Sequence, residues 1–257
     1  MRKTVREIVE KMTSSDNYLI FSVGDSITEG ARATSPDNNY TAVLTRGIAA
    51  RFPMRTVLRY DGKRHRVPDG ELRPIESFGE AVTVQNGTEG KSITVARCGI
   101  GGNTVRRLLN RKQDFIGKEI DGRLGDLFLI VAGINDSLVK DPAKYTEPTQ
   151  YHANLYELLD EIERANPEAD VILMTPTYYG DGSTADIPLS EYAEEMRRVA
   201  KEKCLPLVDL HALWMQHLVV GGPLYGQGDW LVSDKCHPSD KGHAAIAAEI
   251  LRVLFEK

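Results

Sequence analysis

Two short segments near opposite ends of the chain contain residue types that could carry out acyl transfer. Ser26 lies in the segment 24–30 (GDSITEG), and Asp234 and His237 lie in the segment 234–239 (DKCHPS). A serine hydroxyl is a poor nucleophile unless an adjacent base takes its proton, and that base needs an acid to orient it. The two segments together supply a candidate for each of these roles.

The surroundings of Ser26 predict a position at the edge of a sheet. An apolar run over 18–23 (YLIFSV) is bounded by polar residues and is typical of a buried strand, so Ser26 comes on the turn that leaves it. Ligands of open α/β sheets bind at the carboxyl ends of the strands. Taken alone, a serine here is more commonly a turn residue or a helix N-cap.

The spacing of Asp234 and His237 strengthens the catalytic interpretation. The two residues are three positions apart, so in a tight turn the carboxylate can accept from one imidazole nitrogen while the other stays free to take a proton. Pro238 biases His237 away from helix, and Ser239 or Asp240 can cap a helix that begins near residue 241. The histidine is therefore expected in a loop at a helix start.

With these motifs the chain resembles the SGNH hydrolases, also called GDSL-type esterases and lipases. Four blocks of that family occur here in the family's order, between residues 24 and 238, and their ordered occurrence is far more specific than any one block. The name GDSL stands for Gly-Asp-Ser-Leu, but in this chain Ile27 takes the place of the leucine. Arg97 takes the place of the asparagine that often opens the second block. The blocks are Gly24-Asp25-Ser26, Cys98-Gly99-Ile100-Gly101-Gly102-Asn103-Thr104, Gly133-Ile134-Asn135-Asp136 and Asp234 with His237.

The resemblance implies a serine ester hydrolase that works through an acyl-enzyme. It assigns Ser26 as nucleophile, His237 as base and Asp234 as the acid that orients the base. It also implies an oxyanion hole formed by the backbone N–H groups of Ser26 and Gly102 and the side chain of Asn135. The glycines and Asn135 could equally form turns after strands, which is compatible with that role. No metal or organic cofactor is required.

The substrate expected from this resemblance is a short acyl ester, in particular an O-acetyl group on a carbohydrate. Aromatic residues between Trp214 and Trp230, including Tyr225, predict a loop over the pocket, since aromatic faces pack on sugar rings and acyl groups alike. Asp25, Trp230 and Tyr225 are the candidate substrate contacts. An acyltransferase, a thioesterase or a lysophospholipase with the same triad remains an alternative, as does a non-catalytic carbohydrate-binding protein of the same fold.

Other functional motifs fit less well. The glycine run 99–104 lacks the last glycine of a dinucleotide fingerprint, the Gly-Lys-Ser/Thr of a phosphate-binding loop is missing, and no Gly-x-Ser-x-Gly surrounds Ser26. A zinc site from Asp234, Cys236, His237 and His243 is conceivable. We favour the Asp-x-x-His interpretation over the zinc site because it explains more of the chain. His243 is then expected to be a residue in the first turn of a helix.

Composition narrows the class of protein. The 257 residues carry a formal net charge of −5, with no basic stripe, which argues against nucleic acid or an anionic membrane as partner. Three scattered cysteines do not form a disulfide framework, and no apolar run approaches the ~18 residues of a membrane span. We therefore predict a cytoplasmic protein that acts on a small-molecule or carbohydrate ester, with oligomerisation left open.

The elements that must position these residues alternate between strand and helix along one domain, residues 1–257. This order predicts a parallel sheet with helices on both faces, and the resemblance implies a flavodoxin-like α/β/α sandwich with five parallel strands. An insertion over about 55–91 holds a predicted β-hairpin, 82–84 with 92–95, around Asn86-Gly87. Strands are predicted at 18–23, 92–96, 127–131, 171–175 and 206–210, and helices at 1–12, 40–52, 104–111, 150–165, 189–203 and 240–255.

Overall fold

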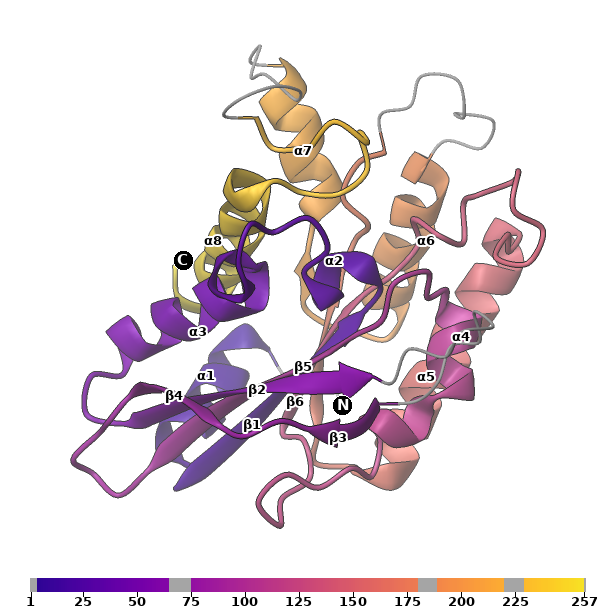
Figure 1. The fold of residues 1–257 in the computed structure, drawn as a ribbon. Coiled ribbons are helices and arrows are strands. Elements are labelled where there is room, and N and C mark those ends of the chain that lie inside the picture. The colour runs from indigo at the N-terminus through magenta and orange to yellow at the C-terminus, as the bar shows by residue number, and fades with distance from the viewer. Residues whose placement is uncertain (1–3, 65–74, 180–188, 220–228, 257) are drawn as a thin grey trace.

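The computed structural model describes residues 4–64, 75–179, 189–219 and 229–256. In these segments the helices and strands alternate along the chain (Figure 1). The helices are α1 (Val5–Ser14), α2 (Ser26–Glu29), α3 (Tyr40–Arg51), α4 (Val105–Asn110), α5 (Pro148–Ala165), α6 (Leu189–Glu202), α7 (Leu210–Val219) and α8 (Asp240–Phe255), with short 3₁₀ turns η1 (Pro36–Asn38) and η2 (Lys112–Asp114). The strands are β1 (Asn17–Gly24), β2 (Thr56–Arg64), β3 (Ile75–Phe78), β4 (Val82–Gln85), β5 (Ser92–Gly99), β6 (Leu127–Val131), β7 (Asp170–Met174) and β8 (Leu207–Val208).

The described strands form one sheet, in the order β3-β2-β5-β1-β6-β7-β8, with β4 also paired to β2. The neighbours from β2 to β8 all pair in parallel. The five predicted strands occupy the consecutive places β5, β1, β6, β7 and β8, so the predicted α/β architecture is confirmed. The parallel set is one strand larger than predicted, because β2 joins it beside β5.

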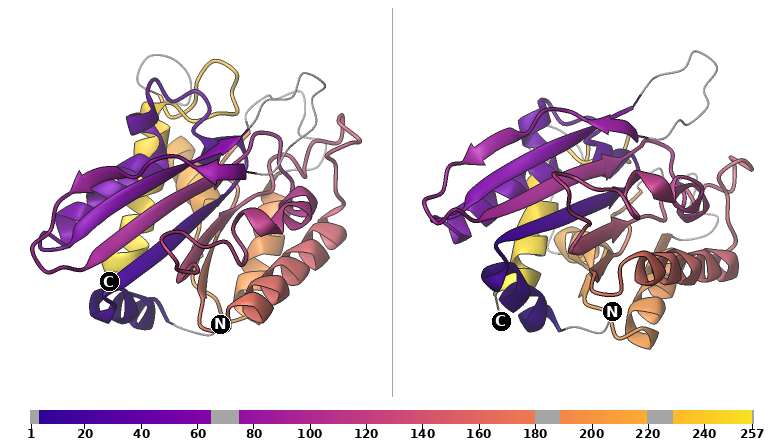
Figure 2. Two further views of the ribbon diagram at one scale, coloured as in Figure 1. Left: turned by 60° about the horizontal axis from the view of Figure 1, so that its bottom comes forward. Right: turned by 90° about the horizontal axis from the view of Figure 1, so that it is seen from below.

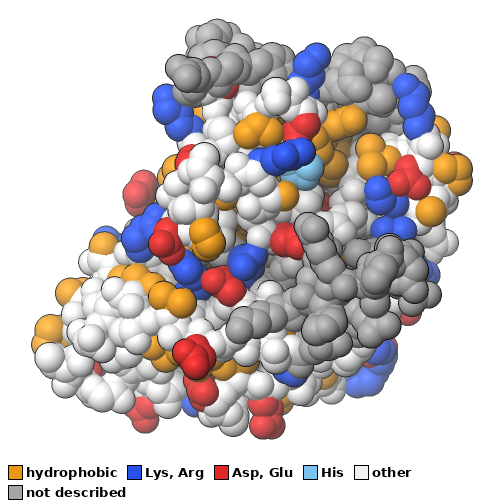
Figure 3. All heavy atoms as spheres, in the orientation of Figure 1, with side chains coloured by type: hydrophobic (Ala, Val, Ile, Leu, Met, Phe, Trp, Pro, Cys, Tyr) orange, Lys and Arg blue, Asp and Glu red, His pale blue; other side chains and the backbone are white. Residues whose placement is uncertain are grey.

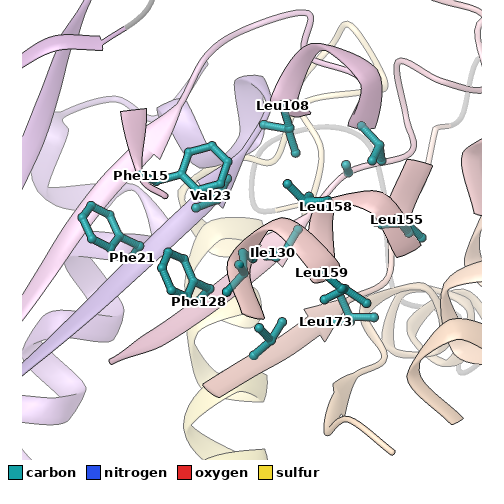
Figure 4. Close-up of a cluster of buried hydrophobic side chains, with 14 of the residues drawn as sticks. Phe21, Val23, Leu108, Phe115, Phe128, Ile130, Leu155, Leu158, Leu159 and Leu173 are labelled. Carbon is teal, nitrogen blue, oxygen red and sulfur yellow. The ribbon is translucent and has the colours of Figure 1, made fainter. Parts of the chain in front are cut away.

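Helices cover both faces of this sheet (Figure 2). Side chains alternate along a strand, so β1 sends Phe21 and Val23 to one face and Tyr18 and Ile20 to the other. The first face packs against α4, α5 and α6, where Phe128, among others, joins the cluster shown in Figure 4. The second face packs against α1, α3, α7 and α8. Two separate apolar layers therefore fix the three-layer sandwich.

The predicted hairpin within the insertion is wrong. β4 pairs antiparallel with β2, and β5 has β1 and β2 as its neighbours, so residues 82–84 and 92–95 do not pair with each other. Gly87 serves close packing instead of a hairpin turn. A Cβ atom at Gly87 would lie 2.1 Å from the carbonyl carbon of Arg55. The φ of Gly87 does not lie in the left-handed region that would require glycine. β3 and β4 instead follow one another along the outer edge of β2.

A second departure concerns the segment after β7. The strand predicted at 206–210 is reduced to β8, and a helix that was not predicted, α7, begins at Leu210. The Asp209 carboxylate accepts from the Ala212 amide at 3.0 Å, as an N-cap does. Trp214, placed by the sequence in an aromatic loop, is a fully buried residue of this helix. The signal was an aspartate followed by good helix formers.

The carboxyl ends of the central strands lie together at one edge of the sheet. β1 ends at Gly24 directly before α2, and its last residue is paired in register with Gly99 at the end of β5. β6, the other neighbour of β1, ends at Val131, two residues before the segment 133–136. Three of the four sequence blocks therefore leave adjacent strands at one edge. None of the described helices is both long and apolar enough to cross a lipid bilayer.

Candidate active site

The structure brings Ser26, His237 and Asp234 into one hydrogen-bonded chain. His237 Nε2 lies 2.9 Å from Ser26 Oγ, and His237 Nδ1 lies 2.9 Å from Asp234 Oδ2. Because an ionised carboxylate only accepts, the hydrogen of the neutral ring must be on Nδ1, which leaves Nε2 to accept from the serine hydroxyl. This is the order of contacts that nucleophile activation requires.

Local contacts hold Asp234 in its ionised form. Burial by itself raises the pKa of Asp234, but its Oδ1 accepts the backbone amides of His237 and Cys236 at 2.9 and 3.1 Å, and its Oδ2 meets the imidazole. These hydrogen bonds outweigh burial and lower the pKa to about 2. Arg32 Nε lies 3.2 Å from the same Oδ2. Asp234 therefore stays charged across the neutral range.

The loop that carries Asp234 and His237 is closed on itself. The Val232 amide donates to the His237 carbonyl at 3.0 Å, and the Lys235 amide donates to the Val232 carbonyl at 2.9 Å. Lys235 has a φ of 58°, which turns the chain tightly between the two functional residues. Ser239 then caps α8, accepting from the Gly242 amide at 3.2 Å and donating to the Asp229 carbonyl. We refer to residues 229–239 as the acid–base loop.

The turn that carries Ser26 is anchored through the carbonyl of Gly24. Three donors reach that oxygen, each at 3.2 Å: the Ile100 amide, Asn103 Nδ2 and Arg111 Nη2. A side chain at Gly24 would collide with the Val131 carbonyl oxygen, because a Cβ would lie 2.7 Å from it. The first segment thus needs glycine for close approach between strands, as well as serine for chemistry.

The candidate oxyanion donors lie on the two neighbouring loops. A methyl group placed on Gly101 would be 3.6 Å from Ser26 Cβ, so Gly101 lies beside the nucleophile. Gly102 has a φ of +80°, a conformation that suits glycine. Asn135 Nδ2 donates to the Asn103 carbonyl at 3.0 Å, which leaves the second hydrogen of that amide for a ligand.

Arginines behind these loops tie the strand ends together. Arg111, 5% exposed, donates to the Gly24 and Cys98 carbonyls and pairs with Asp114 at 3.0 Å. Arg97, where the family often has asparagine, pairs with Asp61 of β2 at 2.9 Å and donates to the backbone at the end of α2. Arg97 therefore links the extra strand to the nucleophile helix.

Two of the three predicted substrate contacts, Asp25 and Trp230, interact with other residues of the protein. Asp25 is 2% exposed, and its carboxylate accepts from the Ile27 amide at 2.9 Å, so it caps α2 and does not reach the surface. Burial raises the pKa of Asp25 to about 6. The ring of Trp230 stacks on His217 and meets Trp214 edge-on, so its described contacts are with α7. Tyr225 lies outside the described residues.

Of the residues of the conceivable zinc site, Asp234 and His237 meet, but the four do not converge on one point. His243 lies in the first turn of α8, as predicted, where its ring stacks on Tyr40 and its Nδ1 accepts from the Tyr40 amide. Burial lowers the pKa of His243 to about 4, and burial raises that of the Cys236 thiol to about 12. Within the segments that the structure describes, no group of three or more His, Cys, Asp or Glu side chains could hold a metal ion.

Two buried or charged neighbours of the site were missed from the sequence. Arg32, with a φ of 69°, contacts Asp234, and Asp136, which is 0% exposed, accepts the amide of Val105 just after the glycine block. Asp136 stands inside a quoted block, which was a usable signal, whereas nothing in the pattern around Arg32 singles it out. The space-filling view shows exposed histidine atoms with basic side-chain atoms beside them (Figure 3).

Comparisons with known proteins find one matching family and several similar structures. A model of the GDSL-like Lipase/Acylhydrolase family matches residues 70–245. Among solved structures, a mutant of Axe2, an acetyl-xylooligosaccharide esterase from Geobacillus stearothermophilus, is similar at 25% identity and a TM-score of 0.65, over 93% of this chain and 95% of that one.

Two further structures are similar over nearly their whole length. LAE5, an alpha/beta hydrolase enzyme from the metagenome of Lake Arreo in Spain, has 25% identity and a TM-score of 0.63, over 93% of this chain and 95% of that one. The acetyl xylan esterase AlAXEase, at 17% identity and a TM-score of 0.64, covers 92% and 100% and supports the fold alone. No curated protein matches the chain.

Proposed function

Because the chain belongs to the GDSL-like lipase/acylhydrolase family, we propose that Ser26, His237 and Asp234 hydrolyse carboxylic esters, in particular O-acetyl esters of a carbohydrate. The observation that carries this proposal is the continuous contact from Ser26 Oγ through the imidazole to Asp234, with 2.9 Å at both steps. A serine, a base and an orienting acid in this order form the machinery of acyl transfer.

The reaction follows from the two contacts of the His237 ring. Ser26 Oγ attacks the ester carbonyl carbon while its proton passes to Nε2, and the collapse of the tetrahedral intermediate sends that proton to the leaving alcohol. Water then attacks the acyl-enzyme and gives a proton to Nε2, which returns it to Ser26 as acetate leaves. Asp234 keeps the imidazole oriented and offsets its transient positive charge.

The negative charge on the former carbonyl oxygen needs donors that are already in place. We assign this role to the amides of Ser26 and Gly102 and to Asn135 Nδ2. No acceptor among the described residues occupies the Ser26 or Gly102 amide. Each such donor contributes about 2.7–4 kcal/mol to transition-state stabilisation in measured cases. The positive φ of Gly102 supports the assignment, since it turns the backbone sharply beside the nucleophile.

The similarity to acetyl-xylooligosaccharide and acetyl xylan esterases supports a carbohydrate acetyl ester as substrate. The similarity to Axe2 extends over 93% of this chain and 95% of that one. Acetylated xylooligosaccharides are therefore the first substrates to try.

The test compares the wild-type protein with Ser26→Ala on p-nitrophenyl acetate and on acetylated xylooligosaccharides, following nitrophenol and acetate release. We expect turnover by the wild type and a loss of about 10⁴-fold or more in kcat for Ser26→Ala. Ser190→Ala, an exposed serine of α6, is the matched control and should keep full activity. Equal rates from wild type and Ser26→Ala would contradict the assignment of the nucleophile.

A chain-length series then decides between ester classes. Acetyl esters should be turned over faster than octanoyl esters, and added alcohol acceptors should not compete with water. Preference for long acyl chains would favour the lysophospholipase alternative, and acyl transfer to an added alcohol would favour the transferase. Binding of the acetylated sugar without acetate release would favour the carbohydrate-binding alternative.

A further inference from the structure

One buried carboxyl joins the two loops that carry the candidate oxyanion donors. Asp136 follows Asn135 at the end of β6 and is 0% exposed. Its Oδ1 accepts the backbone amide of Val105 at 3.1 Å, three residues after Gly102. The same two loops are joined a second time by Asn135 Nδ2 and the Asn103 carbonyl. The loops leave β6 and β5, which are separated by β1, so these side chains bridge a gap of one strand.

The surroundings of the carboxyl favour its neutral form. Burial raises the pKa of Asp136 to about 8, although the Val105 amide opposes this, and the nearby Asp25 carboxylate raises it further. The other titratable groups that face it are Tyr151 from α5 and Tyr192 from α6, neither of which is charged at neutral pH. The Thr146 hydroxyl lies close but donates to the Lys144 carbonyl, so Oδ2 has no donor among the described residues. A proton on Oδ2 removes the buried charge, and the Thr146 hydroxyl, whose own hydrogen goes to the Lys144 carbonyl, can accept it.

We propose that Asp136 is a positioning residue of the oxyanion hole, whose carboxyl holds the Gly102 turn at the distance from Asn135 that lets both donors reach one oxygen. This inference rests on the proposed function. Asp136 itself donates nothing to the substrate and acts through the Val105 amide and its own backbone. Its backbone is held in turn, since its carbonyl accepts the Thr146 amide at 3.0 Å.

The role predicts a loss in the transition state with little loss in substrate binding. A displacement of the order of 1 Å between catalytic groups costs about 10²-fold in rate. Asp136→Leu keeps the number and branching of the side-chain heavy atoms but removes the acceptor for the Val105 amide, so we expect kcat to fall by about 10–100-fold with KM within about 3-fold. Asp136→Asn keeps an oxygen that can accept from the Val105 amide and carries no charge, so it should retain kcat within about 3-fold of wild type.

A matched pair of variants separates positioning from general stability. Asp126 also accepts a strand amide, that of Leu19 at 2.9 Å, but at the opposite end of the sheet. Asp126→Leu should therefore lower the midpoint of urea unfolding without lowering kcat for p-nitrophenyl acetate. Affinity for a trifluoromethyl ketone, which forms an oxyanion on Ser26, should fall in Asp136→Leu in parallel with kcat and stay unchanged in Asp126→Leu.

The dependence of kcat on pH provides a second test of the proposal if Asp136→Leu does not fold. Ionisation of Asp136 would place a second buried negative charge, with that of Asp25, beside the developing oxyanion. The wild-type kcat should therefore decline as the pH rises through about 8, and Asp136→Asn should remove that decline.

Three outcomes would overturn the inference: wild-type kcat in Asp136→Leu, equal losses in Asp136→Asn and Asp136→Leu, or an unchanged alkaline limb in Asp136→Asn. Failure of the proposed function is distinct, because the wild-type protein would then show no turnover that depends on Ser26.

Discussion

The two sides of the candidate active site are held in place in different ways. Ser26 and the oxyanion loops depend on buried hydrogen bonds between residues far apart in sequence, such as the contacts of Arg111 and Asn103 with the Gly24 carbonyl. The acid–base loop depends on contacts within eleven residues, and Asp234 Oδ1 accepts two amides from the next three positions. The hydrogen bond that Ser26 Oγ donates to His237 Nε2 joins the two sides, together with the contact of Arg32 with Asp234.

This difference separates two kinds of failure. A lesion on the nucleophile side removes contacts between strands, so it should lower stability together with activity. A lesion inside the acid–base loop leaves the sheet intact, so it should lower activity with little effect on the fold. The predictions below test that separation.

The largest effect is expected for Asp234→Asn. An amide there can offer its NH₂ group to His237 Nδ1, which favours the wrong tautomer, and the equivalent change in a serine protease lowers kcat by about 10⁴-fold. We expect a loss of that order in kcat for p-nitrophenyl acetate, with an unfolding midpoint in urea close to that of the wild type. A large shift of the midpoint would show that the loop also supports the fold.

Arg32→Ala is the control for this variant. Arg32 contacts the same Oδ2, but its side chain is 64% exposed. Exposed ion pairs contribute only about 0–1 kcal/mol, so we expect kcat to change by less than about 5-fold. A loss as large as that of Asp234→Asn would mean that the arginine, and not the local amides, holds the carboxylate.

Arg111→Met should give the largest loss of stability. The guanidinium is buried and pairs with Asp114, which is 1% exposed, so its removal leaves that carboxylate without its cation and takes one donor from each of the Gly24 and Cys98 carbonyls. Removing one partner of a buried pair costs about 3–5 kcal/mol. Urea denaturation followed by circular dichroism measures this, with Arg164→Met, an exposed arginine, as the control. An unchanged midpoint in Arg111→Met would contradict our account of the nucleophile side.

The same contrast explains which parts could be predicted from the sequence. Asp234 and His237 interact through a spacing of three residues, so their contact follows from local geometry. The strand before Ser26 follows from a continuous apolar run, and β1 has the predicted position to within one residue at each end. Both features are encoded by neighbours in the chain.

The features that were missed depend on contacts between distant residues. The pairing of β4 with β2 requires β2 to occupy the free edge of β5, and nothing in residues 82–95 alone specifies that. The burial of Asp25 likewise depends on neighbouring strands and helices. A polar residue beside a nucleophile resembles a substrate contact until the fold shows that it caps α2.

Asn135→Ala tests the oxyanion assignment. Loss of one donor costs about 10²–10³-fold in kcat in measured cases, with KM nearly unchanged, because the donor acts mainly on the developing charge. Asn135 also donates to the Asn103 carbonyl, so the variant should lose some stability, in keeping with its place on the nucleophile side. Steady-state kinetics on p-nitrophenyl acetate measure both constants. A rise in KM at constant kcat would instead make Asn135 a ground-state binding residue.

The smallest effect is expected where the acid–base loop meets α8. Ser239→Ala removes the N-cap of α8 and the bond to the Asp229 carbonyl, which costs about 1 kcal/mol, or about 2–4 °C in Tm for a chain of this size. Thr4→Ala removes the cap of α1 at the far end of the sheet and should cost a similar amount. Because Ser239 is two residues from His237, Ser239→Ala should also lower kcat several-fold, whereas Thr4→Ala should not. Equal kcat in the two variants would mean that the loop keeps its geometry without the helix that follows it, and that its internal hydrogen bonds alone position the histidine.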